Sequence, residues 1–174
     1  PNHKDIFYII GFLCSSIATN LLNIINPTMN YQAKDIRTLP IIIYSFKKEL
    51  ITEKVLGNIL LAKKDWDSFE TSWDFKVHPL AVSQREREDQ MSYSIHSKER
   101  RDAVSRLNTR YKRWNEECEY RFNQLKANEE ELNRIFIKIY GLQDELTPEV
   151  EDKDVTIRKA DLGRDIRSFI SYAI

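Results

Sequence analysis

Apolar residues follow helical spacing in three stretches of the chain. The first, residues 6–25, carries no charge, and polar side chains recur three or four positions apart along it: Ser16, Thr19, Asn20 and Asn23. This polar stripe predicts one amphipathic helix packed on protein rather than a membrane span, although the stretch would be long enough to span one. Asn26-Pro27 should end the helix, because a residue before proline disfavours the helical conformation.

Residues 38–44, "TLPIIIY", follow after a polar stretch and predict a short strand with Pro40 at its start, where a missing donor costs least. Such a strand needs a partner. Either a missing N-terminal part completes its sheet, or it lies against the helices. The second helical stretch, residues 47–63, is weakened by Gly57 and has these apolar positions: Leu50, Ile51, Val55, Leu56, Ile59 and Leu60.

The third stretch is the longest and begins after Ser97. Its apolar positions step by threes and fours: Leu107, Tyr111, Trp114, Cys118, Phe122, Leu125, Leu132, Phe136 and Ile139. Only Glu129 interrupts the stripe, and Gly141 is a suitable C-cap after Tyr140. A helix of about forty residues is roughly 60 Å long. It must therefore lie against a partner helix, in this chain or in another molecule.

Aromatic residues alternate with acids and hydroxyls in "DWDSFETSWDFKVHPL", residues 65–80. Aromatic side chains can stack on bases, but four carboxylates among them would repel phosphate: Asp65, Asp67, Glu70 and Asp74. We therefore expect the aromatic side chains to pin a loop to the helices. Nearer the C-terminus, Asp161 is expected to begin another surface helix.

Composition supports a mainly α fold. Four glycines and five prolines in 174 residues argue for long helices and against a many-turned β sandwich or barrel. Cys14 and Cys118 both lie in helical apolar patterns, which predicts two buried, reduced thiols in a cytoplasmic protein. The three histidines lack metal-ligand spacing, so no metal is expected.

Charge is unevenly distributed although the formal net charge is zero. Basic residues prevail over residues 1–64 and 85–113, whereas residues 115–154 hold twelve acids against five bases. If the basic positions meet DNA phosphates, the candidates are Lys34, Arg37, Lys47, Lys48, Arg110, Lys112, Arg113, Arg158, Lys159, Arg164 and Arg167. Arg100, Arg101 and Arg106 add to the basic start of the long helix, which is the end that suits DNA. The alternative is a set of solvated helix faces with pairing between residues four positions apart.

Motifs of catalysis and cofactor binding are missing from these residues. The chain has no GxGxxG, GxxxxGK[ST], GxSxG, HExxH or Asn-Pro-Pro-aromatic sequence. No catalytic residue is assigned. From chemistry alone, the sequence reads as a helical interaction or spacer module.

Two passages resemble a known family. "INPTMNYQAKDIRTLPI" resembles the closing segment of the target-recognition region in adenine-specific DNA methyltransferases of restriction-modification and phage-exclusion systems. Residues 65–80 and 115–174 resemble the PglX-type methyltransferases of the BREX phage-exclusion system and their type IIG relatives. The chain begins with Pro1 rather than Met, which favours a fragment of a longer protein.

The resemblance implies a division of the chain. Residues 1–46 would be the end of the target-recognition domain, with one or two short β-strands left from it, and 47–80 a helix and an aromatic loop. Residues 81–99 would be a variable linker, 100–141 a long spacer helix, and 142–174 an acidic loop and the start of a further helical element.

The resemblance also implies a non-catalytic DNA-recognition and spacer role. The parent enzyme would methylate adenine in double-stranded DNA with S-adenosylmethionine, on a flipped-out base, while this fragment alone would bind no cofactor and be inactive. Its partners would be DNA, the catalytic domain of the same chain and, through the long helix, a second copy. The alternative is a structural helical or coiled-coil interaction module without nucleic-acid contact.

Overall fold

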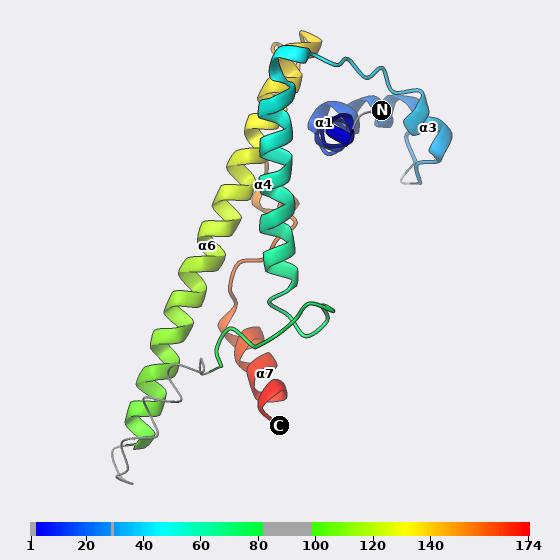
Figure 1. Ribbon diagram of the computed structural model, residues 1–174. Coiled ribbons are helices and arrows are strands. Elements are labelled where there is room, and N and C mark those ends of the chain that lie inside the picture. The colour runs from blue at the N-terminus through cyan, green and yellow to red at the C-terminus, as the bar shows by residue number, and fades with distance from the viewer. Residues whose placement is uncertain (1–2, 29, 82–98) are drawn as a thin grey trace. The chain divides into compact units, whose positions relative to one another are not determined.

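The computed structural model describes residues 3–28, 30–81 and 99–174. These residues are mainly helical (Figure 1). The elements are α1 (His3–Leu13), α2 (Ser16–Ile25), α3 (Ala33–Arg37), the 3₁₀ turn η1 (Ser45–Lys47), α4 (Lys48–Trp66), α6 (Glu99–Tyr140), the 3₁₀ turn η2 (Asp152–Asp154) and α7 (Leu162–Ala173). The predicted linker over residues 81–99 lies almost wholly outside the described residues.

The first apolar stretch forms two helices, so the prediction of one helix over residues 6–25 is wrong. The chain bends by 66° between α1 and α2. Ser15 is buried at the break, where its hydroxyl donates to the Phe12 carbonyl at 2.6 Å and accepts from the Ala18 N–H at 3.5 Å as the N-cap of α2. The predicted end is confirmed, since α2 stops at Ile25 and Asn26 is its C-cap.

The length and hydrophobicity of the described helices bear on whether any of them could cross a membrane. No single one of them is both long and apolar enough to cross a bilayer, and only the bent pair formed by α1 and α2 reaches the required length and composition together.

Residues 40–44 are extended but pair with no strand among the described residues, so the predicted short strands are not confirmed. Two tyrosine hydroxyls take the place of a neighbouring strand. The Tyr140 hydroxyl donates to the Pro40 carbonyl at 2.5 Å and accepts from the Ile42 N–H at 3.2 Å. The Tyr8 hydroxyl donates to the Ile42 carbonyl at 2.9 Å and accepts from the Tyr44 N–H at 3.2 Å. The sequence left two settings open for this segment, pairing in a sheet or contact with the helices. In the structure the segment lies against the helices.

The chain divides into two compact units. The first comprises the described residues of Pro1–Leu61 and Asn123–Thr156, and the second those of Ala62–Phe122 and Ile157–Ile174. Both α4 and α6 therefore supply residues to each unit. The predicted end of α6 is confirmed: Gly141 has a positive φ of 70°, which favours glycine, and the Leu142 N–H bonds the Ile137 carbonyl at 3.0 Å.

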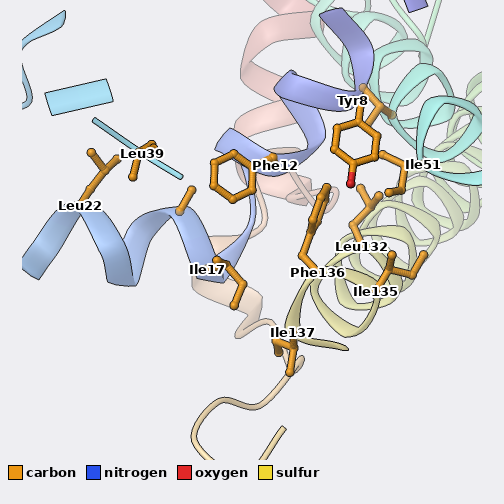
Figure 2. Packing of buried hydrophobic residues seen from close by; sticks show 12 residues of the cluster. Tyr8, Phe12, Ile17, Leu22, Leu39, Ile51, Leu132, Ile135, Phe136 and Ile137 are labelled. Carbon is orange, nitrogen blue, oxygen red and sulfur yellow. The ribbon is translucent and has the colours of Figure 1, made fainter. Parts of the chain in front are cut away.

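The core of the first unit is built by α1, α2, α4 and the last turns of α6 (Figure 2). Phe136 lies edge-on to both Tyr8 and Phe12, with ring centroids 5.6 and 5.7 Å away. Ile51 and Leu132 are buried in the same cluster. Gly11 makes this packing possible, because a Cβ there would lie 2.8 Å from a methyl of Val55.

The core of the second unit is smaller and centres on Trp114, Cys118 and Leu80. Asp161 caps α7 as predicted, accepting from the Arg164 N–H at 2.6 Å. The expectation for the aromatic loop holds for Phe69, which contacts Trp114. It is wrong for Trp73, which is 103% exposed, because the loop is instead braced by its own polar groups: the Ser72 hydroxyl donates to Asp67 at 2.6 Å.

The two cysteines differ from expectation. Cys118 is buried, and burial raises the pKa of its thiol to about 11. Cys14 is exposed rather than buried, because the break between α1 and α2 turns this position out of the apolar face. Both thiols are free.

Candidate nucleic-acid interface

The eleven basic candidates fall into two sets, one in each unit. The first unit holds Lys34, Arg37, Lys47 and Lys48, and the second holds Arg110, Lys112, Arg113, Arg158, Lys159, Arg164 and Arg167. The first set lies on α3, η1 and the start of α4, and most of the second lies on α6 and α7, so each set is described within its own unit.

Arg110 and Arg113 lie together in the second unit. They are one helical turn apart on α6 and line an open groove of about 400 Å³. The other lining residues are Ser68, Pro79, Ala81, Trp114 and Glu117. Arg113 is exposed and Arg110 is half-buried, and both arginines line this water-accessible hollow. This arrangement suits a phosphate oxyanion.

Among the described residues that line the groove, Glu117 is the one acid, and two bases are paired with it. Lys64 approaches its carboxylate at 2.7 Å and Arg121 at 2.9 Å. Burial acts to raise the pKa of Glu117, but the Lys64 hydrogen bond and the two positive charges outweigh it and lower that pKa. The Glu117 carboxylate is thus ionised and paired with bases, in a groove that Arg110 and Arg113 also line.

Arg121 was not among the sequence candidates, and the structure gives it a structural role. Its side chain is 1% exposed, with the guanidinium 4.8 Å from the Trp114 ring centroid and 3.3 Å from the Cys118 sulfur. Asp65, also buried, lies 4.0 Å away. Arg121 lies three residues after Cys118 and four before Leu125, so helical spacing places it on the apolar face of α6. This signal was missed because only the apolar residues of this face were followed in the sequence.

Three of the C-terminal candidates are used in packing. The Arg158 guanidinium lies 3.7 Å from the Phe69 ring centroid and 4.0 Å from Asp65, and the Lys159 ammonium lies 4.3 Å from the Phe122 ring. Arg164 bonds the Asp165 carboxylate at 2.8 Å and the Lys159 carbonyl at 2.9 Å. These side chains stabilise the second unit, whereas Lys112 and Arg167 are exposed.

The four candidates in the first unit are not gathered into one site. Lys34 and Arg37 are exposed on the short helix α3, and Lys48 is paired with Asp5. Lys47 lines a separate groove of about 500 Å³ together with Arg134 and Lys138 of α6. These last two were not predicted, because some ninety residues of chain separate them from Lys47 and no sequence period connects them.

The chain's glycines offer no cradle for a nucleotide cofactor. Gly11, Gly57 and Gly163 lie inside helices, and Gly141 ends α6, so none belongs to a loop that follows a strand. The glycine-containing cofactor loop that the resemblance associates with methyltransferases is therefore not found among the described residues. Among the described residues, no group of three or more histidine, cysteine or acidic side chains is placed to hold a metal ion.

Comparison with known proteins gives two relatives. The chain is 38% identical over 174 residues, 99% of its length, to the adenine-specific methyltransferase PglX of Lacticaseibacillus casei (strain Zhang), of which it spans 13%. It is 30% identical over 76 residues, 44% of its length, to the adenine-specific methyltransferase BrxX of Escherichia coli O9:H4 (strain HS), of which it spans 6%. No family model matches. The resemblance found in the sequence is therefore confirmed, as similarity to a short segment of much longer proteins.

Proposed function

We propose, from this similarity to a segment of adenine-specific methyltransferases, that the chain is a non-catalytic DNA-recognition and spacer part of such an enzyme. The observation that carries the proposal is the match over nearly the whole chain. The whole protein would methylate adenine in double-stranded DNA, using S-adenosylmethionine held by residues outside this segment. In that setting it would serve restriction-modification or phage defence.

Within this role, the groove of the second unit is the DNA contact. Arg110 and Arg113 line a water-accessible hollow, and the pairing of Glu117 with Lys64 and Arg121 weakens the repulsion that this carboxylate would exert on a phosphate. Phosphate contacts position a protein on DNA without reading its sequence. The groove would therefore hold the duplex while other parts of the enzyme recognise the bases.

Charge reversal in the whole enzyme tests this contact. Replacing both residues (Arg110→Glu with Arg113→Glu) should weaken binding to target and non-target duplexes alike. The plot of log K against log salt has a negative slope, and each lost phosphate contact should make it less steep by about one. In the double variant the slope should therefore be less steep by about two. Fluorescence anisotropy over a range of salt concentrations measures both quantities.

A matched control lies on the same helix. The double variant Arg134→Glu with Lys138→Glu makes the same charge change on α6 in the first unit. It should leave the salt slope within error of the unmodified enzyme if the second-unit groove is the contact. Equal losses of DNA affinity in both variants would show that only the overall charge of the protein matters. An unchanged DNA affinity in the Arg110/Arg113 variant would show that the long helix is a spacer only.

A second function, a protein interaction module without nucleic-acid contact, is favoured by one observation. Large apolar side chains are exposed next to one another in the first unit, from Ile41 at 37% to Phe46 at 91%. Contiguous exposed apolar surface of this kind marks contacts with protein. A flat salt dependence, or no DNA binding at low ionic strength, would favour this function.

A further inference from the structure

The extended residues 40–44 have one edge occupied and one edge open. Along an extended chain, the N–H and C=O of successive residues point to opposite edges. Those of Ile42, with the Pro40 carbonyl and the Tyr44 N–H, face the hydroxyls of Tyr8 and Tyr140. Each hydroxyl donates once and accepts once, as a residue of a neighbouring strand would.

The other edge belongs to Ile41 and Ile43. Their main-chain N–H and C=O groups take part in none of the hydrogen bonds found among residues 3–28, 30–81 and 99–174. Their side chains are 37% and 51% exposed. Two outward N–H and C=O pairs, two residues apart and flanked by aliphatic side chains, form the pattern that an adjoining strand recognises.

A groove beside this segment indicates the chemistry of the adjoining strand. Ile42 and Tyr44 line the first-unit groove of about 500 Å³, together with Ile135 and Ile139 of α6. Lys47, Arg134 and Lys138 also line it, and the one acid among the described lining residues, Glu131, pairs with Arg134. Cross-strand neighbours place side chains on the same face. An apolar residue of the adjoining strand opposite Ile42 would thus extend the groove wall. The basic residues of the groove would favour a carboxylate on the same strand.

We propose that an extended, apolar segment of the same polypeptide, outside residues 1–174, pairs as a β-strand with Ile41 and Ile43 and carries an acidic residue toward Lys47 and Lys138. This inference rests on the proposed function, in which the chain is part of a longer methyltransferase. The PglX that it matches is far longer than this chain. Two residues offer too few hydrogen bonds to retain a separate molecule, whereas a tethered segment has a high effective concentration.

Hydrogen exchange of the amides of residues 41 and 43 tests the pairing, read by mass spectrometry with residue-level fragmentation. In the whole enzyme both amides should exchange at least about a hundredfold more slowly than in the 174-residue chain. The variant Ile43→Pro removes one outward N–H while leaving the four bonds to the tyrosine hydroxyls in place. In the whole enzyme it should restore fast exchange at residue 41. Ile43→Val keeps the N–H and should retain protection.

Several results would overturn the proposal. Fast exchange at both amides in the whole enzyme would show an open edge. Protection in the isolated chain, rising with its concentration together with a dimer mass in sedimentation, would make a second copy the occupant. If the proline variant does not fold, the comparison of unmodified enzyme and chain still decides. DNA affinity of the Arg110/Arg113 variant is measured separately, so failure of the DNA role and failure of strand pairing are distinguishable.

Discussion

At the scale of single residues, Glu129 combines a sequence anomaly with a structural consequence. It is the one acid within the apolar stripe of α6, and it is half-buried in the first unit. Burial raises its pKa from 4.5 to about 7. The native state therefore holds a proton that the unfolded chain has lost between these two values. The contribution of Glu129 to the free energy of unfolding therefore falls as pH rises through this window.

Replacing the Glu129 carboxyl with a neutral amide of equal size should remove the cost of burying a charged carboxylate. Glu129→Gln is expected to raise the free energy of unfolding by about 1–3 kcal/mol near pH 8 and to change it little near pH 4.5, where the native carboxyl is already neutral. Urea denaturation followed by circular dichroism at both pH values measures the difference. Glu119→Gln, at an exposed position of the same helix, is the control. An equal gain in both variants, or a gain independent of pH, would contradict the assignment.

At the scale of elements, α6 is held in the first unit by the buried side of its last turns. Leu132 is 5% exposed beside Phe136, whereas Leu60 of α4 is 68% exposed. The substitution Leu132→Ala should lower the free energy of unfolding by about 2–5 kcal/mol through lost burial and a cavity. The matched change Leu60→Ala should cost no more than about 0.5 kcal/mol. Similar losses of unfolding free energy for both leucines in denaturant titrations would show that the buried side of α6 is not where the structure places it.

At the scale of the whole chain, the placement of its glycines predicts that it does not bind the methyl donor. Isothermal titration calorimetry of S-adenosylmethionine into the 174-residue chain should give no heat beyond dilution, and methylation of duplex DNA by the chain should stay at background. The full-length enzyme is the positive control for both assays. Saturable binding by the isolated chain would refute the expected division of labour between this segment and the rest of the enzyme.

Much of this molecule follows from local sequence signals. Asn26-Pro27 ends α2, Gly141 ends α6 and Asp161 begins α7, because proline geometry, the left-handed conformation of glycine and carboxylate capping act over a few residues. The similarity to adenine-specific methyltransferases is likewise a property of the sequence, present before any folding is considered.

Tertiary structure decided what depends on residues distant in the chain. The apolar run divides at Ser15, where the Asn133 side chain of α6 accepts from the Ser16 N–H at 2.9 Å, and residues 40–44 find the hydroxyls of Tyr8 and Tyr140 in place of a strand. The roles of the basic residues also depend on distant parts of the chain: Arg158 packs on an aromatic ring, whereas Arg113 lines a groove. Periodicity records which face of a helix is apolar, but burial and hydrogen-bond partners are set by which helix lies opposite, and that is fixed only when the chain folds.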